Sequence, residues 1–109
     1  MSRTVFVNGE FLPEEEAKVS IFDRGFLMAD AVYEVTTVLE GKLIAFEGHM
    51  VRLERSLNEL GMNKPEWMDG LLDIHKKLVS ENSLENGMIY LQVSRGAVSY
   101  THLTLPTKA

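Results

Sequence analysis

Apolar and polar side chains alternate with a period of two in the first part of the chain, which is the pattern of half-buried strands. The first such segment, TVFVNGEFLP, surrounds Asn8-Gly9. This dipeptide favours a two-residue hairpin turn because both positions adopt positive φ at low cost. We therefore expect strands near 4–7 and 10–12, with Pro13 ending the second, and a short extended piece over 19–22.

The clearest alternation lies in AVYEVTTVL, residues 31–39, which is rich in β-branched side chains. Two tight polar turns precede it, one at 23–25 and one at Asp30. Glu40-Gly41 then turns the chain into KLIAF, so 31–46 is predicted to be a second hairpin. One face of its first strand carries Tyr33, Val35, Thr37 and Leu39, and the other carries Val32, Glu34, Thr36 and Val38.

The period changes to that of a helix at Glu47. Residues 47–60 form an amphipathic pattern, and Gly61 stands where a helix C-cap favours glycine. A second helix is expected over roughly 66–81, and after Asn86-Gly87 a strand over 88–95. The predicted inward positions are Met50, Leu53, Leu57 and Leu60 in the first helix, and Trp67, Leu71, Ile74 or His75, and Leu78 in the second. This order of elements predicts an α+β fold with a mostly antiparallel sheet and two helices.

Composition and charge exclude several classes of function. The 109 residues allow one small domain, and the net charge of −5 with a pI near 5.1 argues against nucleic acid as a partner. The one basic run, His75-Lys76-Lys77, is short, and we interpret it as the solvated side of a helix. The absence of cysteine excludes disulfides and thiolate chemistry. With no signal peptide and no apolar run of about 20 residues, we expect a cytoplasmic protein that does not enter a membrane.

Common catalytic signatures are absent from the sequence: it has no Gly-rich phosphate loop, HExxH motif or nucleophile elbow. The three histidines, His49, His75 and His102, are too scattered to suggest a metal site, and His49 is expected to be structural. Asp23 and Arg24 are explained by a local ion pair that pins their loop.

Tyr33 and Arg52 are the candidates for a functional site, and each has two explanations. The Tyr33 hydroxyl can face a cavity at the end of its strand, or Tyr33 can be a core side chain with a satisfied hydroxyl. Arg52 can direct its guanidinium at a phosphate, or it can be a solvated helix arginine. Taken alone, general burial habits favour the structural explanation of both residues.

Longer strings of the sequence favour the functional explanation of both residues. The segment VFVNGEFLPEEEAKVSIFDRGFLMADAVYEV, followed by EGKL and then HMVRLERSLNELGM, resembles the N-terminal half of the class IV (fold type IV) pyridoxal-phosphate aminotransferases. Within that family it most resembles the D-amino acid aminotransferases. The resemblance covers residues 4 to 96 in order, and the spacing of "DRGF…AD.VYEV" and "H…RL..S" is specific.

The resemblance implies roles for both candidates. Arg52 matches the family's arginine that contacts the phosphate of pyridoxal 5'-phosphate, and Tyr33 matches the tyrosine that lines the substrate pocket. It also implies a transaminase that moves an amino group from a D-amino acid such as D-alanine to a 2-oxo acid. The family is usually a homodimer with sites near the subunit interface.

The catalytic lysine of the family lies in a second, C-terminal domain. None of the lysines at 18, 42, 64, 76, 77 and 108 matches it. We therefore assign residues 1–96 to the N-terminal domain, expect the catalytic-lysine domain to be absent, and predict that the chain alone is inactive, with no catalytic residue of its own. Residues 97–109 resemble a translated sequencing-adapter remnant, so we expect a non-native tail.

Three alternatives remain at this point. A branched-chain aminotransferase or an aminodeoxychorismate lyase would share the fold but differ in reaction, and the DRGF string in a short N-terminus favours the D-amino acid type. A non-catalytic module that binds a partner through its sheet would not respond to pyridoxal phosphate. Nucleic-acid binding is disfavoured by the charge.

Overall fold

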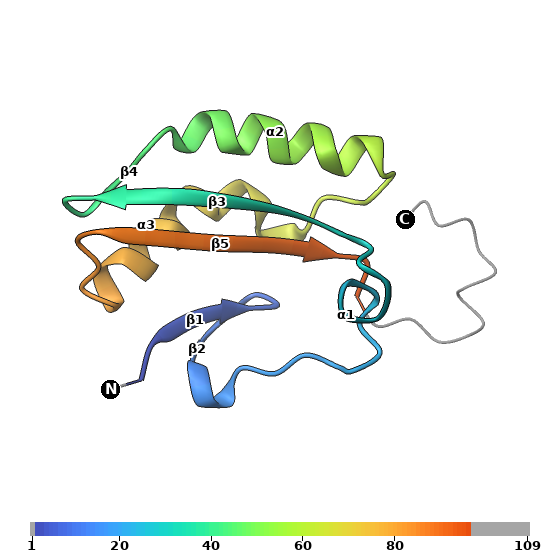
Figure 1. The fold of residues 1–109 in the computed structure, drawn as a ribbon, viewed down its shortest axis with the longest axis horizontal. Coiled ribbons are helices and arrows are strands. Elements are labelled where there is room, and N and C mark those ends of the chain that lie inside the picture. The colour runs from blue at the N-terminus through green and yellow to red at the C-terminus, as the bar shows by residue number, and fades with distance from the viewer. Residues whose placement is uncertain (1, 97–109) are drawn as a thin grey trace. The chain divides into compact units, whose positions relative to one another are not determined.

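The computed structural model describes residues 2–96 (Figure 1). The described residues form two compact units. The first unit comprises residues 2–18, 36–46 and 65–89, and the second comprises 19–35, 47–64 and 90–96. The prediction that residues 97–109 are a non-native tail lies outside the described residues.

The first hairpin forms where Asn8-Gly9 predicts it. Strand β1 (Thr4–Val7) pairs antiparallel with β2 (Glu10–Pro13), with Val7 opposite Glu10. Asn8 and Gly9 both have positive φ, 49° and 92°, as a tight two-residue turn requires. Pro13 pairs with Thr4 as the last residue of β2, a position that proline tolerates in a strand without neighbours on both sides.

The second sheet has the strand order β4-β3-β5. Strand β3 (Ala31–Leu39) has the predicted bounds, whereas β4 (Lys42–Leu43) is only two residues long and β5 (Gly87–Ser94) begins one residue early. The turn between β3 and β4 is the predicted one, with positive φ at Glu40 and Gly41. The arrows of β3 and β5 point in opposite directions (Figure 1), so the α+β class with an antiparallel sheet is confirmed.

Burial alternates along β3 residue by residue, as the sequence pattern predicts. One face is buried and the opposite face is half-buried or exposed. Three of the four buried positions hold valine or threonine, but one holds an acidic residue. The four buried side chains are Val32, Glu34, Thr36 and Val38.

Helix α2 (Phe46–Glu59) matches the first predicted helix, and Leu53 and Leu57 are fully buried in it. Gly61 ends it with φ 67°. The amide of Met62 donates to the carbonyl of Leu57 at 2.9 Å, and that of Gly61 donates to Asn58 at 3.1 Å. These are the two hydrogen bonds of a Schellman motif. Leu60 is partly exposed rather than inward, because it lies in this terminating turn.

The second predicted helix begins as a 3-10 turn, η2 (Glu66–Gly70), and becomes α3 (Leu71–Glu81) only after Gly70, a residue of low helix propensity. His75, not Ile74, is the buried alternative. Our interpretation of His75 as part of a solvated basic run is therefore wrong. Its Nδ1 lies 2.8 Å from the Leu71 carbonyl oxygen, and its ring packs edge-on against Phe46.

The region before β3 differs most from the prediction. Residues 19–22 form no strand and end in a turn at 21–22, and a short 3-10 helix, η1 (Glu14–Glu16), precedes them. The expected turn at 23–25 is the start of a five-residue helix, α1 (Arg24–Met28). Asp23 caps it by accepting a hydrogen bond from the Gly25 amide at 2.8 Å.

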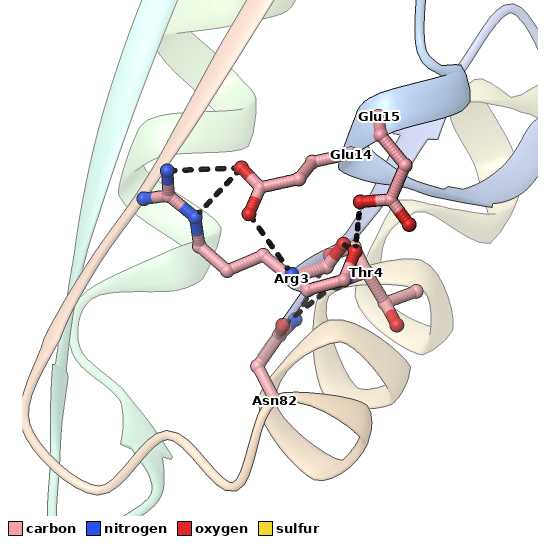
Figure 2. Close-up of polar contacts among 6 residues, drawn as sticks. Arg3, Thr4, Glu14, Glu15 and Asn82 are labelled. Atoms are coloured by element: carbon pink, nitrogen blue, oxygen red, sulfur yellow. Dashed lines mark hydrogen bonds and ion pairs between the residues drawn. The ribbon is translucent and has the colours of Figure 1, made fainter.

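Asn82, just after α3, holds the first strand of the first unit in place (Figure 2). Its Oδ1 accepts from the Thr4 amide and its Nδ2 donates to the Thr4 carbonyl, both at 2.9 Å. Nδ2 also donates to the carbonyl of Leu78. The amide side chain therefore takes the place of a neighbouring strand for β1. The ion pair between Arg3 and Glu14 beside it is exposed, so we expect little stability from it.

Replacing Asn82 with alanine should lower the free energy of unfolding by about 1–3 kcal/mol, because both Thr4 backbone groups lose their partners. Asn86→Ala is the control, since Asn86 makes one exposed contact with the Glu40 amide at 3.2 Å. Its loss should cost less than about 1 kcal/mol. Urea unfolding of both variants measures the two values, and equal losses would contradict the role of Asn82.

Candidate functional site

A buried carboxylate lies at the centre of the candidate site in the second unit. The Glu34 side chain is 4% exposed, and it points from β3 to two residues of α2. Arg52 Nε donates to Glu34 Oε2 at 2.9 Å, and Arg52 Nη2 donates to Oε1 at 2.8 Å. This is a side-on bidentate pair, which fixes the plane of the guanidinium as well as its position.

His49 completes the group, because its Nδ1 lies 2.7 Å from Glu34 Oε1. An ionised carboxylate can only accept hydrogen bonds, so the proton of this contact is on Nδ1. One oxygen of Glu34 thus receives hydrogen bonds from both His49 and Arg52, which lie three residues apart on one side of α2. The expectation that His49 is structural is consistent with this contact.

The contacts of Glu34 shift the pKa of the pair in opposite directions. The hydrogen bonds from Arg52 hold the pKa of the Glu34 carboxyl below its ordinary value, against the opposing effect of burial, and the contact with His49 adds to the lowering. The hydrogen bond to Glu34 and its charge raise the pKa of Arg52, and the nearby Tyr33 adds to this. Both groups are therefore charged at neutral pH.

Arg52 remains half open to solvent, with 57% of its side chain exposed. The pair with Glu34 uses Nε and one N–H of Nη2, out of the five N–H groups of a guanidinium. Nη1 and the second N–H of Nη2 point away from the carboxylate. Arg52 is thus neither a solvated helix arginine nor fully satisfied by its partner.

Tyr33 lies on the other face of β3 and is 63% exposed. It is therefore not a core side chain, which was one of its two explanations from the sequence. Its ring stacks on Tyr90 of β5 at a centroid distance of 5.7 Å and an interplanar angle of 16°. The Tyr90 hydroxyl donates to Gln92 Oε1 at 2.7 Å. Two exposed aromatic rings thus stack on each other on the exposed face of β3 and β5. Its role in binding substrate stays a prediction.

Two arginines fix the loop before β3 through Asp30. Arg95 Nε donates to Asp30 Oδ2 at 2.8 Å, and Arg24 Nε lies 3.2 Å from the same oxygen. Arg95 Nη2 also donates to the carbonyl of Leu60, next to the end of α2. The predicted pairing of Arg24 with Asp23 is wrong, because Asp23 instead caps α1.

Gly25 is required by a close approach to β5. A Cβ atom at this position would lie 2.9 Å from Ser94 Cβ, 2.9 Å from Gln92 Nε2 and 3.0 Å from Asp23 Oδ1. The Ser94 hydroxyl donates to Asp23 at 2.7 Å and holds the two segments together. Each residue of the Asp-Arg-Gly string thus has a structural role. Asp23 caps α1, Arg24 pairs with Asp30, and Gly25 leaves room for β5.

Sequence reasoning missed Glu34 as a site residue. The signal was present, because Glu34 is the charged member of the face that otherwise holds Val32, Thr36 and Val38. A carboxylate on a buried strand face needs a cationic partner. Within residues 2–96, no group of three or more His, Asp or Glu side chains is placed to hold a metal ion.

A family model described as amino-transferase class IV matches residues 31–108 of the chain. The chain belongs to this family. The match includes β3 with Tyr33 and Glu34, and α2 with His49 and Arg52. It also extends into residues 97–108, for which the prediction of a non-native tail remains untested.

Curated relatives of the chain carry the name D-alanine aminotransferase. One from Staphylococcus epidermidis is 41% identical over 103 residues, which is 94% of this chain and 36% of the relative. One from Listeria monocytogenes is 35% identical over 102 residues, with 94% and 35% of the two chains covered. The chain thus spans about a third of the length of the curated relatives that it matches.

Solved structures of similar fold include branched-chain amino acid aminotransferases. That from T.th., complexed with N-(5'-phosphopyridoxyl)-L-glutamate, has a TM-score of 0.82 and 24% identity, covering 91% of this chain and 35% of the other. That from Escherichia coli has a TM-score of 0.82 and 21% identity, covering 92% and 35%. At these identities the likeness shows the fold alone, and it confirms the predicted fold type IV architecture.

The described helices include none that is long and apolar enough to cross a membrane.

Gly25→Ala should destabilise the protein, because the added Cβ meets the backbone-anchored Ser94 Cβ at 2.9 Å. We expect a loss of about 1–3 kcal/mol from overpacking. Gly48→Ala is the matched control, since a Cβ at that position would meet nothing within 4 Å outside the adjacent backbone of α2, and it should gain about 0.5–1 kcal/mol from helix propensity. Thermal unfolding measures both, and a stabilised Gly25→Ala variant would show that the close approach is not required.

The lowered pKa of Glu34 makes stability depend on pH in a defined direction. The group stabilises the fold above the ordinary carboxyl pKa of about 4.3, and this contribution disappears as pH falls through the lowered value. The difference in unfolding free energy between the wild type and Glu34→Gln should therefore be largest near pH 7 and shrink toward pH 3. Urea unfolding across this range tests it, with Glu47→Gln as an exposed control. A constant difference would contradict the lowered pKa.

Proposed function

We propose that the chain is part of a pyridoxal-phosphate-dependent aminotransferase that moves an amino group from a D-amino acid, such as D-alanine, to a 2-oxo acid. The observation that carries this proposal is the 41% identity to D-alanine aminotransferase over 94% of the chain. This identity spans the loop 23–30, β3 and α2, which hold Tyr33, Glu34 and Arg52.

The described residues fit the phosphate group of the cofactor. Among the described residues, Arg52 offers N–H groups that Glu34 does not use, in a fixed plane, and phosphate is an anion that this planar donor arrangement suits. A half-exposed guanidinium that is already oriented by Glu34 can reach a phosphate without losing that partner. We therefore assign Arg52 to phosphate binding.

Tyr33 is assigned to the substrate side of the site. Its exposed ring, stacked on Tyr90, presents an apolar face and a hydroxyl that can donate to a carboxylate or a carbonyl oxygen. The loop that ends at Asp30 fixes the start of its strand. Tyr33 can thus orient an amino acid, while Arg52 holds the cofactor by its phosphate.

The bound cofactor supplies an electron-accepting ring, which amino-group transfer requires. In this proposal the described residues bind and orient, and none of them moves the proton. The prediction that this chain alone does not catalyse stays a prediction. It would be contradicted by turnover of D-alanine and 2-oxoglutarate when the purified 109-residue chain is mixed with pyridoxal phosphate.

The proposal includes a homodimer in the cytoplasm. Exposed apolar side chains before and within α1 support association, because exposed apolar surface is typical of an interface. They follow one another closely in the sequence of the second unit: Val19, Ile21, Phe22, Phe26, Leu27 and Met28.

The test is a chimera in which residues 4–96 replace the matching segment of the Staphylococcus epidermidis D-alanine aminotransferase. We expect it to transfer the amino group of D-alanine to 2-oxoglutarate. Arg52→Ala in the chimera should weaken pyridoxal phosphate binding by about tenfold or more, the value of a lost charge-assisted hydrogen bond. Arg55→Ala, which removes an exposed arginine of the same helix, is the control.

Two results would contradict the proposal. A folded chimera that uses L-leucine but not D-alanine would favour the branched-chain alternative. Equal cofactor affinity in Arg52→Ala and Arg55→Ala would overturn the assignment of Arg52 while leaving the reaction in place.

A further inference from the structure

Glu34 presents a problem that phosphate binding by Arg52 does not explain. A carboxylate beside a phosphate-binding arginine partly cancels the charge that attracts the phosphate. On charge alone, the site would hold phosphate better without Glu34. Yet its carboxylate is buried and receives three hydrogen bonds from α2, two from Arg52 and one from His49.

The geometry suggests orientation as the reason. More than half of the Arg52 side chain is exposed, so without a partner it would sample many rotamers and lose side-chain entropy when a ligand fixed it. The side-on pair with Glu34 removes this freedom before any ligand binds. His49 in turn fixes the carboxylate through the oxygen that Arg52 Nη2 uses.

We propose that Glu34 is a positioning residue, which holds the Arg52 guanidinium in one plane so that Nη1 and the free N–H of Nη2 face the phosphate. This inference rests on the proposed function, because it assumes that Arg52 is the phosphate contact. Glu34 touches neither phosphate nor substrate. It increases affinity by reducing the entropy that Arg52 loses on binding.

The experiment measures how the 109-residue chain binds pyridoxamine 5'-phosphate, a probe that has the ring and phosphate but no aldehyde to react with lysine. The variants are Glu34→Gln, Arg52→Ala and the double variant. Glu47→Gln is the control, because it removes the same charge from an exposed position of α2. Titration calorimetry gives each dissociation constant.

We expect Glu34→Gln to weaken binding by about fivefold, the equivalent of one lost hydrogen bond. Glu47→Gln should leave binding equal or slightly stronger. In the Arg52→Ala background, Glu34→Gln should have no further effect. If Glu34→Gln weakens binding only when Arg52 is present, Glu34 acts by positioning Arg52. If Glu34 had a structural role, Glu34→Gln would weaken binding in both backgrounds.

The other outcomes are distinguishable. If Arg52→Ala weakens binding and Glu34→Gln does not, the positioning role is wrong and the phosphate contact stands. If Glu34→Gln weakens binding equally with and without Arg52, its role is structural and the inference is wrong. If Arg52→Ala binds the probe as the wild type does, the phosphate assignment fails and this inference fails with it.

A measurement on the unsubstituted chain covers the case in which Glu34→Gln does not fold. Hydrogen exchange of the Arg52 Nε–H, followed by NMR, should be at least about fivefold slower than that of Arg55, because only the first donates a short hydrogen bond. Equal rates would show that Arg52 is not held, and would overturn the proposal without any variant.

Discussion

A carboxylate buried on a strand must be neutralised and hydrogen-bonded, since an isolated charge in that position costs several kcal/mol. In this chain the requirement falls on Glu34, and α2 meets it with Arg52 and His49. The contact fixes which face of β3 is buried and which side of α2 faces it. A one-residue shift of β3 would bury Tyr33 and expose Glu34. The same contact leaves part of Arg52 open, so one interaction both holds the second unit together and orients the guanidinium that we propose binds phosphate.

In the loop before β3, a second carboxylate, that of Asp30, likewise lies against cationic side chains. Asp30 receives one hydrogen bond from Arg95 and lies against Arg24, and both arginines are mostly buried. Two guanidinium groups thus converge on one carboxylate at the start of β3, while one guanidinium and one imidazole converge on Glu34 farther along. Tyr33 lies between these two positions in the sequence. Its backbone is therefore fixed on both sides, while its side chain remains exposed on the other face.

The sequence was a good guide wherever one local rule decided the structure. Asn8-Gly9 fixed the first hairpin, the strict alternation of 31–39 fixed β3 to the residue, and Gly61 fixed the end of α2. It was a poor guide where distant residues decided. Helix α1 depends on the Asp23 cap and on contact with Ser94, 71 residues away. Periodicity left Ile74 and His75 as alternatives for one inward position, and the distant Phe46, whose ring contacts that of His75, is what distinguishes them.

The sequence indicated only part of the candidate site, because contacts between distant residues also decide its geometry. Resemblance to the family indicated Tyr33 and Arg52, but their surroundings are three-dimensional facts: the stack on Tyr90 and the pair with Glu34. The family and the fold are shown by the comparisons, and the roles of both residues remain proposals. The most direct measurement follows the guanidinium nitrogen resonances of Arg52 by NMR while pyridoxamine 5'-phosphate is added. The account predicts that Nη1 shifts while Nε, held by Glu34, stays nearly constant. Shifts at Nε as large as those at Nη1, or no shift at Arg52 at all, would contradict it.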